Sequence, residues 1–200
     1  MEKLFVSNSQ ESSRMFKSGL LESLSKVHFT VPLIIYIPVI LYFGWRGYAG
    51  EIGPYLLTLA GGLVFWTFTE YTLHRFVFHY QPTSSWGKKL HFIFHGVHHD
   101  YPNDAYRLVM PPSASIPLAT GFYFLFTLFL DPPFRYTFFA AFMTGYLFYD
   151  ITHYALHHFH FKGSIWKKLK QHHMLHHYTN PDKGYGVSSP LWDKIFRTDL

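Results

Sequence analysis

The chain has 200 residues, a length typical of a single domain, and a formal net charge of +5 at pH 7. Hydrophobic residues make up 48% of it and aromatic residues 21%, whereas only 14% are charged, against about 25% in a soluble domain. It contains no cysteine, which excludes disulfides, thiolate zinc fingers, iron–sulfur clusters and cysteine nucleophiles.

The first 28 residues are polar and of mixed charge, and no cleavable signal peptide is apparent in them. We predict that residues 1–28 form a cytoplasmic N-terminal arm and that residues 29–200 form a membrane-embedded domain. Four apolar segments of this domain are candidate membrane helices, because a span needs about 20 mostly apolar residues. In chain order they are Phe29–Trp45, Pro54–Phe78, Ser113–Leu130 and Phe134–Tyr149, the last continuing to His158. Buried helices of a soluble protein are the alternative, but four such segments leave too little polar surface to cover them.

The connections between these segments are tight and rich in Gly or Pro, which predicts two helical hairpins. "GWRGYAGEIGP" joins the first pair and "DPPF" the second. Fourteen Lys and Arg residues lie in the arm, in the middle loop between the hairpins and after His158, whereas the two turns contain only Arg46 and Arg135. By the positive-inside rule, the arm, the middle loop and the C-terminal region are cytoplasmic. We attribute the basic residues to the membrane and expect no nucleic acid partner.

Most of the 15 histidines fall into four groups on this predicted cytoplasmic side. "HRFVFH" ends the second segment, "HFIFHGVHH" lies in the middle loop, "HYALHH" ends the fourth segment and "HHMLHH" lies in the C-terminal region. From Pro54 to His74 and from Phe134 to His153 a helix rises by about 30 Å and about 29 Å, so both helices bring histidines to the same depth. The predicted fold is therefore all-α and integral to a membrane, with four transmembrane helices in two hairpins under a cytoplasmic, histidine-rich helical cap.

The spacing within each group follows the helix period, since residues three and four apart share a face. Three sets are each expected to point one way: His95 with His98 and His99, His173 with His176 and His177, and His153 with His157. His74 and His79 are five apart, which is about 140° on an unbroken helix. They need a local distortion, or a metal reached from two directions.

Neutral imidazole is a good ligand for zinc, iron, copper and nickel. Because one ion takes about four to six ligands, about ten convergent imidazoles imply two metal ions. A solvated histidine is the alternative for any single member, and it is our interpretation of His28 and His160, which fit no spacing. Glu70 and Asp150 precede histidines on the same helices, so we expect their carboxylates to accept hydrogen bonds from ligating imidazoles. A helix-end salt bridge is the alternative for Asp150.

These motifs resemble those of the fatty acid hydroxylase superfamily of histidine-box membrane oxygenases, and more narrowly the catalytic domain of fatty acid 2-hydroxylases. The resemblance covers about residue 28 to Leu200 and rests on "EYTLHRFVFH", "FHGVHHDYPND", "YDITHYALHH" and "LKQHHMLHHY". His-x-x-His-His alone is shared by several related oxidases, whereas "YRLVMPP" and "GYGVSSPLWDKIF" are similar to the 2-hydroxylase branch. The resemblance implies metal ligands at His74, His79, His95, His98, His99, His153, His157, His173, His176 and His177. His91, His158 and His172 lie next to these ligands in the sequence and are weaker candidates for metal ligands.

The resemblance also implies a reaction: hydroxylation of the carbon next to the carbonyl of a long fatty acyl chain, free or N-linked in a sphingolipid, with O2. Iron is the implied working metal of a dinuclear centre, and zinc in purified protein would be a substitute or structural form, because zinc cannot change its redox state. Tyr149 and Tyr185 flank matched motifs and are candidates to orient the acyl carbonyl, with ordinary interfacial tyrosines as the alternative.

Many family members carry a fused b-type cytochrome domain that delivers electrons. The 28 residues before the first helix are too few for one, so we expect a separate electron donor, either a b-type cytochrome or a ferredoxin-like protein. The expected location is the endoplasmic reticulum or the bacterial inner membrane. Two other interpretations stay open: a sister oxygenase (a desaturase, or a sterol or carotenoid hydroxylase), and a non-enzymatic membrane protein that binds or transports metal. Transport predicts ionisable residues along the span, whereas these histidines gather at one end.

Overall fold

The structure is a computed structural model that describes residues 5–200. Residues 1–4, which begin the expected arm and include Lys3, lie outside the described residues. The described part of the chain contains helices and no strands. The helices are α1 (Gly19–Leu24), α2 (Thr30–Gly47), α3 (Ile52–Leu73), η1 (His74–Phe78), α4 (Ser85–His91), η2 (Phe92–Gly96), α5 (Val97–Asp100), α6 (Pro112–Phe126), α7 (Phe134–His158), α8 (Ser164–Tyr178) and α9 (Leu191–Phe196).

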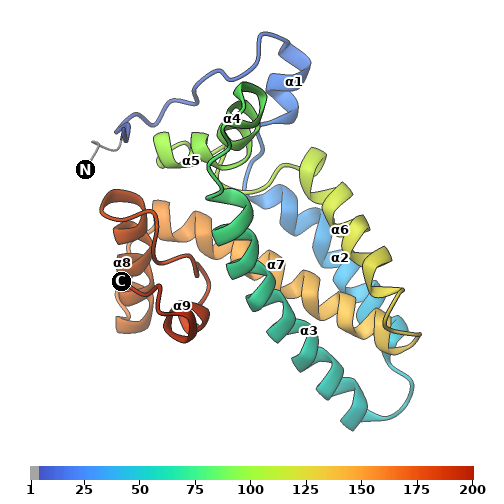
Figure 1. The fold of residues 1–200 in the computed structure, drawn as a ribbon. Coiled ribbons are helices and arrows are strands. Elements are labelled where there is room, and N and C mark those ends of the chain that lie inside the picture. Colours follow the sequence, from blue (N-terminus) through green and yellow to red (C-terminus); the bar gives the residue numbers. More distant parts are fainter. Residues whose placement is uncertain (1–4) are drawn as a thin grey trace.

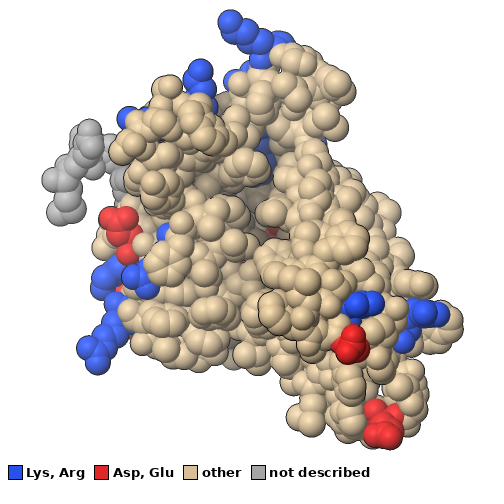
Figure 2. Space-filling model, turned by 45° about the vertical axis from the view of Figure 1, so that its right-hand side comes forward, with Lys and Arg blue, Asp and Glu red and all other residues tan. Residues whose placement is uncertain are grey.

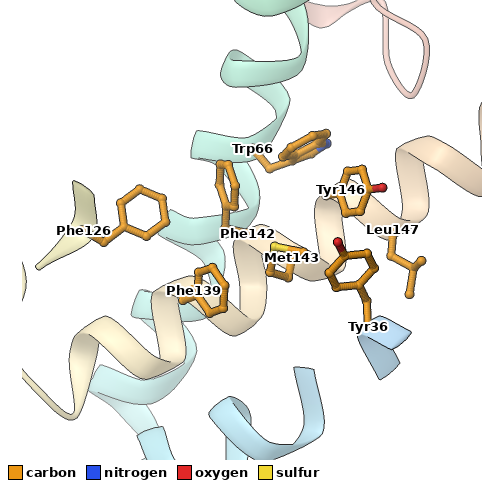
Figure 3. Packing of buried hydrophobic residues seen from close by; sticks show 8 residues of the cluster. All are labelled: Tyr36, Trp66, Phe126, Phe139, Phe142, Met143, Tyr146 and Leu147. Carbon is orange, nitrogen blue, oxygen red and sulfur yellow. The ribbon is translucent and has the colours of Figure 1, made fainter. Parts of the chain in front are cut away.

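Helix α7 is the centre of the fold and packs against α2, α3 and α6 (Figure 1). Its buried face presents a cluster of large apolar side chains that meets one residue from each of the three neighbouring helices (Figure 3). The neighbours are Tyr36 of α2, Trp66 of α3 and Phe126 of α6; α7 supplies Phe139, Phe142, Met143, Tyr146 and Leu147. Aromatic rings bury large areas and pack edge to face, so this cluster fixes the helices relative to one another.

Two glycines allow α3 and α7 to approach closely. A Cβ on Gly62 of α3 would lie 2.5 Å from the carbonyl oxygen of Phe138, and one on Gly145 of α7 would lie 2.5 Å from the Trp66 side chain. Small residues at a helix crossing let two backbones come together, and they are typical of helix pairs in membranes. The crossing of α3 and α7 sets where the histidines at the ends of both helices arrive.

Two helical stretches are long and apolar enough to cross a membrane: Thr30–Gly47 and Ile52–Phe78, the latter being α3 together with η1. Within the most apolar 18 residues of each stretch only 17% are buried, and large apolar side chains such as Leu41 and Leu57 are 65% and 76% exposed. Between its ends, the face seen in Figure 2 carries almost no charged side chains. Exposed apolar side chains on a face with so little charge mark a contact with lipid or with another protein. These helices indicate a membrane protein.

Helices α6 and α7, which correspond to the other two expected spans, match the length and composition of a membrane helix less well. Helix α6 has only 15 residues, and α7 carries Asp150 and three histidines in its second half. Four transmembrane helices therefore stay a prediction. The two tight turns do lie together, since the Thr137 hydroxyl donates to the Gly47 carbonyl at 3.1 Å. Helices α4, α5, α8 and α9 lie toward the other end of the molecule (Figure 1).

Candidate metal centre

A π-helical turn ends the third helix. The backbone N–H of His79 donates to the carbonyl of His74 at 3.1 Å, across five residues, and η1 spans His74–Phe78. A π-turn widens the helix by one residue per turn and is frequent at functional sites. It is the local distortion that the five-residue spacing required, and it brings His74 and His79 to one side.

The structure brings together all ten histidines that the sequence singled out, in two groups of five. In each group the candidate ligand nitrogens lie within 4.8 Å of one another. Group A consists of His74, His79, His95, His99 and His176; group B consists of His98, His153, His157, His173 and His177. The groups adjoin, because the ring centroids of His99 and His177 are 4.2 Å apart and stacked.

The two His-x-x-His-His motifs are each divided between the groups, which differs from the expectation that each motif points one way. His95 and His99 belong to group A while His98 joins group B; His173 and His177 belong to group B while His176 joins group A. On a helix, positions i+3 and i+4 lie on opposite sides of position i, by about 60° and about 40°. A motif seated between two sites therefore places its i and i+4 members in one and its i+3 member in the other.

The contacts between imidazoles fit a cation in each group. His95 Nε2 lies 3.2 Å from His74 Nε2, 3.0 Å from His79 Nε2 and 3.0 Å from His99 Nε2. One imidazole nitrogen has a single proton or a single lone pair, so it cannot make three such hydrogen bonds. Ligand nitrogens about 2.0–2.1 Å from one ion are themselves roughly 3 Å apart. The separations of 2.9–3.0 Å in group B, as from His98 to His153 and His177, have the same explanation.

Burial keeps these imidazoles uncharged. Burial, aided by neighbouring imidazoles, lowers the pKa of His98, His99, His173 and His177 well below the usual value of 6.5. Burial also lowers the pKa of His176, to about 4, although its hydrogen bond to the Lys183 carbonyl works in the opposite direction. At neutral pH the rings therefore carry the lone pairs that metal binding needs.

Backbone carbonyls of one loop orient two ligands of group A. The Nδ1–H of His176 donates to the Lys183 carbonyl at 2.6 Å, and that of His74 donates to the Tyr185 carbonyl at 2.5 Å. These bonds assign the proton to Nδ1 and leave Nε2 as the ligand atom. Sequence reasoning missed both contacts, because a backbone carbonyl gives no signal in the residue type.

Two buried carboxylates hold this loop, and this corrects the role expected of Glu70. Glu70 accepts hydrogen bonds from the backbone N–H groups of Val187 and Ser188, each at 2.8 Å, and from the Ser188 hydroxyl, but none from an imidazole. Asp193, which sequence reasoning also missed, accepts from the backbone N–H groups of Tyr185 and Gly186 at 2.9 and 2.7 Å. Its position inside the matched "GYGVSSPLWDKIF" stretch was the available signal.

Asp150 also differs from expectation. Its carboxylate accepts from the Met110 backbone N–H at 3.1 Å and from the Tyr146 hydroxyl at 3.3 Å, so it ties the middle loop to α7 and bonds neither to an imidazole nor to a helix-end cation. Tyr149 and His153 stack with centroids 5.8 Å apart. Tyr185 packs its ring beside group A and serves His74 through its backbone carbonyl.

The weaker candidates lie outside both groups. His172 Nε2 is 3.4 Å from an Asp193 carboxylate oxygen, and within residues 5–200 the Nε2 atoms of His91 and His158 have no hydrogen-bond partner. His28 pairs with the Thr30 hydroxyl, and His160 is exposed.

An apolar cavity of about 510 Å³ leads to the histidines. This volume lies in the range of pockets that hold small molecules. His95 of group A and His98 and His153 of group B line it, together with Tyr149 and Asp150. The rest of its wall is mainly apolar and comes from the arm, the middle loop and α6. A ligand that filled this cavity would lie beside both groups at once.

Comparison with known proteins identifies relatives of this chain. The fatty acid hydroxylase family matches residues 59–198. The dihydroceramide fatty acyl 2-hydroxylase FAH2 of Arabidopsis thaliana is 40% identical over 190 residues, which are 94% of this chain and 80% of that protein. The fatty acid 2-hydroxylase of Mus musculus is 37% identical over 212 residues, which are 92% of this chain and 56% of that protein.

A solved structure of full-length scs7p, in which only the hydroxylase domain is visible, superposes with a TM-score of 0.86 at 37% identity. The match covers 91% of this chain and 70% of that chain. The proteins named as fatty acid 2-hydroxylases are oxygenase enzymes. The family match over residues 59–198, the identity to these relatives and the shared fold together show that the chain belongs to the fatty acid hydroxylase family.

Proposed function

We propose that this protein is a membrane oxygenase that hydroxylates the carbon next to the carbonyl of long fatty acyl chains, at a dinuclear metal centre held by groups A and B. The observation that carries the proposal is the apolar cavity, because His95, His98 and His153 line it from both groups. The relatives act on fatty acyl chains, two of them by name on dihydroceramide fatty acyl chains. The substrate is accordingly a long acyl chain, free or N-linked in a ceramide-type lipid.

The residues of this chain do the positioning. The apolar lining holds the acyl chain and excludes water from the reacting carbon. The Lys183 and Tyr185 carbonyls fix two imidazoles of group A through their Nδ1 protons. Iron, when bound by the ten histidines, supplies the redox chemistry that activates O2, which zinc cannot do. O2 with two electrons and two protons converts the C–H bond to C–OH and releases water; the electrons come from a separate b-type cytochrome or ferredoxin-like donor.

The reaction can be tested directly. Expressed in a host with a compatible electron donor, the protein should add one oxygen to long acyl chains beside the carbonyl. Mass spectrometry after lipid hydrolysis should detect 2-hydroxy acids, labelled from oxygen-18 gas and not from labelled water. A double bond instead would favour a desaturase, and hydroxylation confined to sterols or carotenoids would favour a sister hydroxylase. Bound iron with a competent donor but no lipid change would leave metal binding or transport as the better account.

We further propose four transmembrane helices, with the arm, the middle loop and the C-terminal region in the cytoplasm of the endoplasmic reticulum or bacterial inner membrane. The distribution of Lys and Arg supports this orientation. Because the chain has no cysteine, single cysteines can report it. Cysteines at Gly50 and Pro132 should react with an impermeant thiol reagent from the non-cytoplasmic side, and those at Ser84 and Lys183 only after permeabilisation. Labelling of Lys183→Cys before permeabilisation would overturn the topology.

A further inference from the structure

The N-terminal arm forms part of the wall of the cavity. Met15, Phe16, Leu21, Leu24 and Ser25 all line the space that reaches the histidines. In Figure 1 the arm crosses the top of the molecule, from beside α5 to α1. Without these side chains the cavity would be open along the arm.

An ion pair between a buried arginine and a partly buried glutamate holds the arm in place. The guanidinium of Arg107, in the middle loop, donates to a Glu22 carboxylate oxygen at 2.6 Å, to the Ser13 carbonyl at 2.7 Å and to the Ser25 hydroxyl at 2.8 Å. Arg107 is 9% exposed, so these contacts are shielded from water. Because Arg107 is buried, removing Glu22 would weaken the compensation of its charge, to which Asp104 also contributes at 3.3 Å from Arg107 Nε.

Glu22 also folds the arm back on itself. Its second carboxylate oxygen accepts the backbone N–H groups of Met15 and Phe16, each at 3.0 Å. Burial by itself raises the pKa of Glu22, but the hydrogen bonds from Lys26, Phe16 and Met15 and the charge of Arg107 bring the pKa down to about 2. Glu22 thus stays ionised, and the two cavity-lining residues are tied to the same carboxylate as Arg107.

Helix α1 turns one face to the cavity. Leu21 and Leu24, three residues apart, both line it, whereas Leu20 does not and is 69% exposed. The Ser113 hydroxyl donates to the Leu24 carbonyl at 2.8 Å and ties α1 to the start of α6. Ala114, Pro117 and Leu118 of α6 line the same cavity.

We propose that residues 15–25 form a fixed wall of the cavity that selects acyl chains by length and shape. Leu21 and Leu24 are the specificity-determining residues of this wall, and the Glu22–Arg107 ion pair keeps it rigid. This inference rests on the proposed function, because it assumes that the cavity binds an acyl chain. An apolar wall discriminates by excluded volume, and one methylene in such a pocket changes selection by about tenfold or more.

The first test is a competition, in which wild-type protein and variants receive one mixture of fatty acids from lauric to lignoceric acid. Leu24→Trp should shift the ratio of 2-hydroxy products toward shorter chains by about tenfold, and Leu24→Ala should shift it toward longer chains. Leu20→Trp is the matched control and should leave the ratio unchanged. Because the ratio of products is measured within one assay, it does not depend on how much protein is expressed. A uniform fall in all products, or an unchanged ratio in both Leu24 variants, would overturn the proposal.

The second test does not need turnover. Leu24→Cys and Leu20→Cys, each the sole cysteine of its chain, are reconstituted in lipid bilayers and labelled with a maleimide. Stearic acid or N-stearoyl sphinganine should slow labelling at Leu24→Cys by about tenfold and leave Leu20→Cys unaffected. If the lipid protects Leu24→Cys from labelling but the wild type hydroxylates nothing, the proposed reaction is wrong and the proposed role of the wall stands. If the wild type hydroxylates acyl chains but the lipid does not protect Leu24→Cys, the proposed role of the wall is wrong and the proposed reaction stands. The lipid that protects better identifies which form of acyl chain enters.

Discussion

Replacing His98 by alanine is expected to abolish hydroxylation and to remove one metal ion per chain. His98 is the only member of group B from the middle loop, and its Nε2 lies within 3.0 Å of those of His153 and His177. Mutation of the groups that hydrogen-bond to metal ligands already changes metal affinity or activity by about 10–100-fold. Loss of a ligand itself should therefore lower activity by more than about a hundredfold. Metal analysis of purified protein should fall from about two ions per chain to about one.

His176→Ala should have the same effect on group A, because His176 is its only member from the C-terminal region. The controls are His28→Ala, at an exposed position, and His158→Ala, beside the boxes but outside both groups. Both should keep their metal and their activity. Full activity in His98→Ala or His176→Ala would refute the dinuclear assignment.

Asp193→Ala should be the most damaging change outside the ten histidines. Asp193 is completely buried and accepts hydrogen bonds from Tyr185 N, Gly186 N and the Thr198 hydroxyl at 2.7–2.9 Å. Each donor left unpaired in a buried place costs about 1–3 kcal/mol. The loop that carries the Lys183 and Tyr185 carbonyls would lose the one of its two anchors that holds Tyr185 and Gly186, which would disturb the orientation of His176 and His74.

We therefore expect Asp193→Ala to lower the melting temperature and to reduce metal affinity by about 10–100-fold, with the loss in group A rather than group B. Asp182→Ala is the matched control, since Asp182 precedes the same loop but is exposed. Thermal unfolding and metal titration would measure both effects. Equal metal loss from both groups, or none, would contradict a role through the loop.

Burial raises the pKa of Asp193, but its hydrogen bonds from His172, Gly186, Thr198 and Tyr185 outweigh burial and hold the pKa below its usual value of 3.8. A carboxyl whose pKa is lowered by folding stabilises the fold above its unfolded pKa. Its contribution is thus present in full at neutral pH and is lost only as the pH falls below 3.8 toward the lower folded value. The loop should stay anchored throughout the physiological range.

The sequence by itself determined where the long apolar helices lie and which ten histidines come together. Long apolar runs separated by Gly- and Pro-rich turns have few alternatives to helical hairpins, and the observed helices begin and end within a few residues of the expected ones. The i, i+4 pairs His95/His99, His153/His157 and His173/His177 each stay within one group, because one helical turn keeps them on one face. The five-residue spacing of His74 and His79 required a distortion, which the π-turn supplies.

The tertiary structure alone decided how the remaining residues combine. His98 and His176 cross to the opposite group because i+3 and i+4 flank position i on two sides, and only the placement of the helices determines which site each side faces. Glu70 binds a loop rather than an imidazole, Asp193 binds the same loop and among the imidazoles contacts only that of His172, which lies outside both groups, and Arg107 meets Glu22 from 85 positions away in the chain. Such contacts form between groups that are far apart in the sequence and meet only after the helices pack. The local spacing of residues does not predict which distant groups will meet.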